Sequence, residues 1–223
     1  MVMKFEGAIT WSRWADFDQC GLLFQLRHIE KRKEPPAPHF VKGARVHEHV
    51  DAWLKRRIPL LPDEAEPLAL QLLALRKEKN LVGEEAWGYT EEWEPLPATG
   101  YFSKRDWLRA KIDALVIKAK LLRVIDFKTG KMRPISAEQV KFYGMLALLR
   151  YENVETAALE LWYLEQGMVE AHTPVERAEI PKLKREYELK FQRMTSATKF
   201  LPNPGLYCRW CPFSKQRGGP CTY

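Results

Sequence analysis

Two charged side chains close an apolar, strand-like run in the segment LLRVIDFKTGK, residues 121–131. Asp126 and Lys128 are two positions apart, so on a strand both point to one face while Phe127 points to the other. An acid and a base at the end of an apolar strand indicate either a chemically active site or an internal ion pair. The D-x-K pattern alone does not separate these two readings.

A second acid, Asp113, lies thirteen residues upstream in the apolar run RAKIDALVI. A short turn after residue 117 would form a hairpin and bring Asp113 close to Asp126. Two carboxylates held together repel, and Mg²⁺ is commonly bound by one or two carboxylates together with a substrate phosphate. Lys128 beside such an ion would stabilise developing negative charge or orient a water, as phosphodiester hydrolysis requires. The alternative is structural ion pairs, Asp126 with Lys128 or Asp113 with Lys111.

Polar residues on two predicted helices extend this constellation. Gln139 and Tyr143 are four positions apart and share one helix face, from which they would touch a DNA backbone or orient Lys128; the alternative is a partly buried structural pair. His47 follows Gly43 by four residues in KGARVHEHV. His49 lies on another face of that helix, and the spacing from Gly43 favours His47.

The segments KIDALV, RVIDFKTGK and EQVKFYGML resemble the PD-(D/E)XK nuclease superfamily, in particular its RecB-like branch. That branch carries a G-x-x-D type motif, an acid-x-Lys motif often written D-x-K-T-G, and Q-x-x-x-Y on the next helix. The order matches along most of the chain, although Ile112, not proline, precedes the first acid. The resemblance implies a restriction-endonuclease-like core that cleaves nucleic acid with Mg²⁺ or Mn²⁺.

The resemblance also implies roles for individual residues. His47, Asp113 and Asp126 would bind the metal ion, with the carbonyl of Phe127 as a further oxygen ligand. Lys128 would be catalytic. The remaining members of the expected site are Gln139 and Tyr143.

Four cysteines form a second candidate centre: Cys20, Cys208, Cys211 and Cys221. Four thiolates suit zinc or an iron–sulfur cluster, and unrelated reduced cysteines are the alternative. One cysteine on an N-terminal helix and three in the tail, with CRWCPF, resemble the iron–sulfur subset of RecB-like nucleases, which includes CRISPR-associated exonucleases. The resemblance implies a 4Fe–4S cluster that joins the two ends of the chain, with Zn²⁺ as the alternative occupant.

The bulk composition fits one globular domain that acts on a polyanion. The 223 residues predict a single domain, 1–223, with a core at about 40–180 and an iron–sulfur subdomain made of the Cys20 helix and residues 200–223. The net charge of +7 fits a polyanionic partner, most commonly nucleic acid such as DNA, and a mildly basic enzyme without a nucleic-acid partner is the alternative. No apolar run is long enough to cross a membrane, and we expect a cytoplasmic protein.

The pattern of apolar residues predicts an α/β fold, a mixed central sheet flanked by helices. The predicted helices are 10–29, 39–57, 67–79, 136–151 and 180–199. The predicted strands are 84–94, 109–117, 121–128 and two within 157–175. A proline-rich break is predicted at 34–38.

The leading hypothesis is a metal-dependent deoxyribonuclease, an exonuclease acting on DNA ends or single strands in recombination, repair or CRISPR adaptation. No G-x-x-x-x-G-K-S/T loop is present, so the chain would be either a stand-alone nuclease or one that relies on a protein partner in such a complex. One alternative is a non-cleaving iron–sulfur DNA-binding subunit, which would be expected to have lost Asp113, Asp126 or Lys128. A weaker alternative is a zinc-stabilised RNA-binding module. Basic clusters with interleaved aromatics are candidates for holding the strand: Trp107, Tyr187, Phe191 and Trp210.

Overall fold

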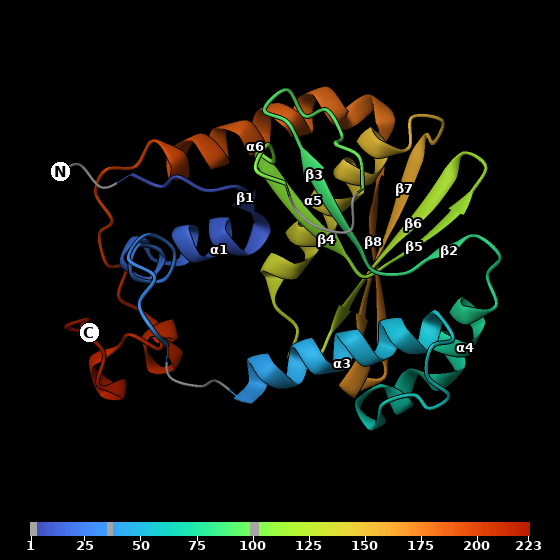
Figure 1. Ribbon diagram of the computed structural model, residues 1–223, viewed down its shortest axis with the longest axis horizontal. Coiled ribbons are helices and arrows are strands. Elements are labelled where there is room, and N and C mark those ends of the chain that lie inside the picture. The colour runs from blue at the N-terminus through green and yellow to red at the C-terminus, as the bar shows by residue number, and fades with distance from the viewer. Residues whose placement is uncertain (1–3, 35–37, 99–102) are drawn as a thin grey trace. The chain divides into compact units, whose positions relative to one another are not determined.

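The computed structural model describes residues 4–34, 38–98 and 103–223 (Figure 1). They divide into two compact units. The first unit combines Met1–Ala37 with Lys184–Tyr223, and the second is Pro38–Leu183. The predicted break at 34–38 lies mostly outside the described residues.

A five-stranded sheet forms the centre of the second unit. Its strands, in spatial order, are β2 (Leu81–Val82), β5 (Ala114–Lys118), β6 (Leu121–Lys128), β7 (Thr156–Tyr163) and β8 (Met168–Glu176). β6 and β7 are parallel and the other neighbours are antiparallel. Parallel neighbours need a crossover, and α5 (Pro134–Arg150) supplies it. The predicted mixed central sheet is confirmed.

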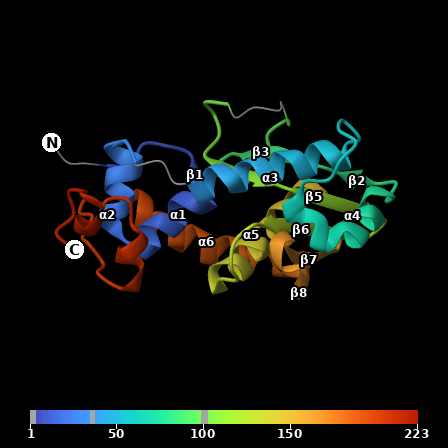
Figure 2. The ribbon, with the colours of Figure 1, turned by 90° about the horizontal axis from the view of Figure 1, so that it is seen from below.

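Helices cover both faces of this sheet, as Figure 2 shows for α3 and α5. The covering helices are α3 (Pro38–Leu54), the 3₁₀ helix Asp63–Leu68, α4 (Ala69–Arg76) and α5. Val46, Val50 and Trp53 of α3 pack in one apolar cluster with Ile125 and Phe127 of β6. Because side chains alternate along a strand, Asp126 and Lys128 face the opposite side, where α5 lies.

The strand predicted at 109–117 is two strands that belong to different sheets. β4 (Leu108–Ile112) pairs with β3 (Glu85–Tyr89), whereas β5 joins the central sheet. Asp113 is the bend between them. The strand predicted at 84–94 is likewise shorter, because β3 ends at Tyr89.

The first unit contains short helices and the C-terminal tail. Its elements are β1 (Ile9–Thr10), α1 (Trp11–Gln19), α2 (Gly21–Phe24), a π-helix (Gln25–Ile29), the part of α6 (Ile180–Thr195) that starts at Lys184, and 3₁₀ turns at Leu206–Trp210 and Lys215–Arg217. The prediction of one continuous helix over 10–29 is wrong. The helix predicted at 180–199 ends four residues early, at Thr195.

Tertiary contact explains the break in the first helix. Cys20 is extended, with φ −165° and ψ 117°. The backbone N–H of Leu22 donates to the carbonyl of Leu201 at 3.2 Å. A Cβ atom placed on Gly21 would lie 2.9 Å from that same carbonyl oxygen. The tail therefore packs directly against the position where the helix is interrupted.

Candidate active site

The β5–β6 hairpin brings the two predicted carboxylates together. In this antiparallel hairpin Ala114 is the partner of Ile125. Asp113 precedes Ala114 and Asp126 follows Ile125, so the two acids lie opposite each other. The two residues are only 9% and 4% exposed. Two buried acids that face each other are costly unless cations neutralise them.

Asp113 is held by two donors. Its Oδ1 lies 3.0 Å from Nδ1 of His47, which projects from α3, and its Oδ2 accepts from the backbone N–H of Phe127 at 2.8 Å. Burial by itself raises the pKa of Asp113. The charge of His47 and these two hydrogen bonds outweigh burial, so the pKa is lowered overall.

Asp126 has the opposite balance. Its Oδ2 forms an ion pair with Nζ of Lys128 but lacks hydrogen-bond geometry, so this buried oxygen has no hydrogen-bond partner in the described structure. Burial and then the neighbouring charge of Asp113 raise the pKa of Asp126, against the opposing effect of Lys128. One carboxylate is thus stabilised as the anion, while the other favours a proton or a cation.

Lys128 is positioned by the helix that follows its strand. Its Nζ donates to Oε1 of Gln139 at 2.8 Å, and Nε2 of Gln139 donates to the hydroxyl oxygen of Tyr143 at 2.9 Å. Tyr143 is 6% exposed, and burial, followed by the charge of Asp126, raises its pKa. Gln139 and Tyr143 thus form a hydrogen-bonded chain that leads to the lysine, as one of the interpretations open from their spacing requires.

The structure brings together all the side chains predicted for this site and separates the alternatives. His49 is exposed and lines a different hollow, with Arg45 and Pro59. Sequence reasoning missed Tyr163 of β7. It pairs in register with Lys128 and, by strand alternation, faces the same side.

The donor set fits a hard divalent cation. Carboxylate oxygens and a backbone carbonyl suit Mg²⁺ or Mn²⁺, whereas an imidazole nitrogen is more typical of transition metals. In residues 4–34, 38–98 and 103–223, no three acidic, histidine or cysteine side chains converge as a closed metal site. At the acids, His47 contacts a carboxylate oxygen of Asp113 and Lys128 contacts one of Asp126.

The sequence profile described as "PD-(D/E)XK nuclease superfamily" matches residues 8–216. The chain belongs to this superfamily. The expected superfamily is thereby confirmed, and membership supports a nuclease, whereas the RecB-like branch stays a prediction. No curated protein matches the chain.

Two solved structures are similar to this superfamily member. One, named "Putative exonuclease", comes from Eubacterium rectale; it shares 11% identity, has a TM-score of 0.50, and the match covers 92% of this chain and 86% of that one. The other is a crystal structure of SSO0001, with 15% identity, a TM-score of 0.43 and coverage of 93% and 84%. At this identity the first likeness shows the fold alone. No helix in the described parts of this nuclease has both the length and the apolar character to cross a bilayer.

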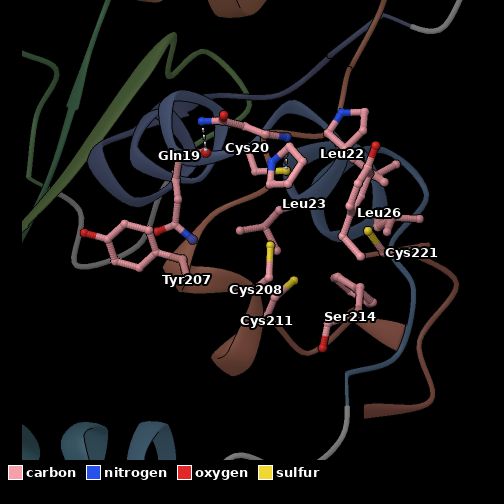
Figure 3. Close-up of a pocket in the computed structure, with 15 residues that line it drawn as sticks. Gln19, Cys20, Leu22, Leu23, Leu26, Tyr207, Cys208, Cys211, Ser214 and Cys221 are labelled. Carbon is pink, nitrogen blue, oxygen red and sulfur yellow. Dashed lines mark hydrogen bonds between the residues drawn. The ribbon is translucent and has the colours of Figure 1, made fainter. Parts of the chain in front are cut away.

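The four cysteines of the nuclease line one small cavity in the first unit, of about 30 Å³ (Figure 3). Leu23, Leu26 and Phe213 form its apolar cluster. Burial raises the pKa of the Cys211 thiol, and the charges of the other three cysteines raise it further. Within the described residues, the cysteine side chains do not converge closely enough to form a metal site.

A buried serine adds a second sign of a ligand in this cavity. Ser214 lines it, is 1% exposed, and its Oγ has no hydrogen-bond partner in the described structure. The backbone N–H of Asn203 donates to Sγ of Cys20 at 3.4 Å, as an N–H does to a metal-bound sulfur. The donor chemistry fits a thiolate-bound metal.

Proposed function

We propose that this chain is an Mg²⁺- or Mn²⁺-dependent deoxyribonuclease of the RecB-like branch, and an exonuclease that degrades DNA from ends or along single strands. The observation that supports it most is the pair of buried, facing carboxylates, Asp113 and Asp126, beside a lysine fixed by Gln139. A purely structural ion pair does not need a second acid directly opposite the first.

Each residue has a distinct task in this proposal. Asp113, Asp126, His47 and the carbonyl of Phe127 would hold the divalent ion. Bound there, the ion supplies Lewis acidity at the scissile phosphate. Lys128, released from Asp126, orients the attacking water or stabilises the charge that develops on the phosphate oxygens.

The hydrogen-bond chain supports Lys128 in that task. Gln139 uses its carbonyl oxygen for the lysine and its amide nitrogen for Tyr143, which fixes the orientation of the amide. Because the hydroxyl of Tyr143 is buried, this chain is shielded from bulk water. Nζ of Lys128 is therefore already held in a fixed position when the substrate phosphate binds.

We further propose that Cys20, Cys208, Cys211 and Cys221 bind a 4Fe–4S cluster, with Zn²⁺ as the alternative. The tail has few buried apolar residues, so metal binding would contribute much of the folding free energy of the first unit. The unit formed by the Cys20 helix and the tail is then the iron–sulfur subdomain of a single nuclease domain, 1–223. The shared cavity and the unpaired Ser214 support this assignment.

The alternative of a non-cleaving iron–sulfur subunit loses weight because Asp113, Asp126 and Lys128 are all present and adjacent. A zinc-stabilised RNA-binding module is disfavoured by the family membership. We propose action on DNA in the cytoplasm, in recombination, repair or CRISPR adaptation, with a protein partner supplying any strand separation.

A cleavage assay tests the proposal. The protein, purified without oxygen, is incubated with end-labelled single- and double-stranded DNA in Mn²⁺, Mg²⁺ or EDTA. We expect metal-dependent degradation that Asp126→Asn and Lys128→Gln reduce by at least about 100-fold. The matched control is Lys131→Gln, an exposed lysine three residues along, which should cleave normally. Intact DNA in every lane with binding retained would refute the nuclease claim for the isolated chain.

A further inference from the structure

Almost all of the net charge of the chain lies in its last 35 residues. Residues 189–223 contain no Asp or Glu, and the rest of the chain balances 30 basic residues against 29 acidic ones. The six basic residues of this segment are Lys190, Arg193, Lys199, Arg209, Lys215 and Arg217. All but Lys190 are exposed. A positive segment without any carboxylate is complementary to a polyanion.

The same segment exposes large aromatic side chains. Tyr207 and Trp210 are each 60% exposed and Tyr223 is 50% exposed. By contrast, Tyr187 and Phe191, two of the aromatics predicted to hold a strand, are 2% and 1% exposed and belong to the core. That part of the sequence prediction is wrong for them. The bases would have to be met by the tail instead.

The local backbone sets Tyr207 and Trp210 side by side. Both lie on the 3₁₀ helix Leu206–Trp210, and residues three apart on a 3₁₀ helix project in the same direction. The guanidinium of Arg209 lies 5.3 Å from the Trp210 ring centroid. Figure 3 shows the Tyr207 ring extending away from the cysteine sulfurs. Two exposed rings next to a cation form a surface on which the bases of a negatively charged strand can stack.

We infer that the tail binds single-stranded DNA, with Tyr207 and Trp210 stacking on unpaired bases and Arg209, Lys215 and Arg217 contacting phosphates. The inference rests on the proposed function, because the strand is the substrate class of that nuclease. Unpaired bases offer free faces for stacking, whereas a duplex hides them. A protein partner is less suited to this surface, because the Trp210 ring lies beside Arg209 and the segment has no acidic side chain.

Binding without cleavage isolates this surface from the catalytic site. Fluorescence anisotropy in EDTA follows a labelled 20-nucleotide single strand and a matched duplex. Tyr207→Ala with Trp210→Ala should weaken single-strand binding by at least about tenfold and affect the duplex much less. The triple change of Arg209, Lys215 and Arg217 to Gln should reduce the slope of log K against log salt by about 2.

Matched controls remove the same charge, or two exposed apolar side chains, elsewhere. Lys77, Lys79 and Lys104 to Gln removes three exposed charges from the second unit, and Leu60→Ala with Leu70→Ala removes two exposed apolar side chains. These controls should bind as the wild type does. Metal content and melting temperature are measured for every variant, so that loss of the tail fold is detected directly.

The outcomes separate the inference from the proposed function. Unchanged binding in both tail variants, or equal losses in the controls, overturns the inference even if the wild type cleaves DNA. Loss of binding confined to the tail variants supports it even if no cleavage is seen. A wild type that binds neither DNA form but captures a protein through the tail would also overturn it.

Discussion

Replacing each of the two facing aspartates by asparagine should change the stability of the protein in opposite directions. In the metal-free protein Asp113 is stabilised as an anion by His47 and the N–H of Phe127, whereas Asp126 is destabilised by burial and by Asp113. We therefore expect Asp113→Asn to lower the free energy of unfolding at pH 7 and Asp126→Asn to raise it.

The contacts set the magnitudes. Asp113→Asn removes a charge-assisted hydrogen bond to His47, which costs about 2 kcal/mol. Asp126→Asn removes a buried negative charge that lies beside a like charge, and it also removes the ion pair to Lys128. We expect a net increase of about 1 kcal/mol in the free energy of unfolding. For a chain of this length, each kcal/mol changes the melting temperature by about 2–4 °C.

The pH dependence has a defined sign for each acid. The pKa of Asp113 is lowered in the folded state, so its contribution is present above the unfolded value of about 3.9 and is lost as the pH falls through the folded pKa. The pKa of Asp126 is raised, so wild-type stability declines as the pH rises through that raised value. Asp126→Asn should abolish that decline.

Calorimetry in EDTA and in saturating Mn²⁺ measures both effects. At 100 times the dissociation constant, bound metal should stabilise the wild type by about 2.7 kcal/mol and either variant much less. The order of wild type and Asp126→Asn would then reverse on adding metal. Asp63→Asn, at an exposed acid, serves as the control and should leave the melting temperature unchanged. A destabilised Asp126→Asn in EDTA would refute the reasoning.

Three further changes test the packing around the two centres. Tyr143→Phe leaves a glutamine amide without its acceptor and should cost about 1 kcal/mol of stability and lower kcat more than KM, as steady-state kinetics would show. Gly144→Ala would place a Cβ 2.5 Å from Cδ2 of buried Leu159 and should destabilise by about 1–3 kcal/mol in urea titrations; equal midpoints would contradict the packing. Gly219→Ala would overlap the backbone of Phe213, so purified protein should contain less cysteine-bound metal by elemental analysis, with the catalytic unit still folded.

The catalytic pattern could be predicted from sequence because its spacing is local. Alternation on one strand set Asp126 and Lys128 on the same face, and a four-residue step on one helix joined Gln139 to Tyr143. Such relations depend on the backbone period alone. The family match over residues 8–216 agrees with them.

Other features depended on contacts between distant segments. The bend at Asp113 lies between two strand pairings, and a period-2 pattern continues through it without a signal. The interruption at Cys20 arises because Leu201, some 180 residues away, packs against Gly21. Helical periodicity of the flanking residues predicts no break there.

The sequence by itself determined the family, the mixed sheet and the set of side chains that meet at the acids, because periodicity and residue type act over a few positions. Only the tertiary structure decided that Tyr187 and Phe191 are buried while Trp210 is exposed, and that His47 and Lys128 contact the two carboxylates. The burial of a side chain and the partner of a charged group depend on which distant segments pack together, and the local sequence pattern does not specify that.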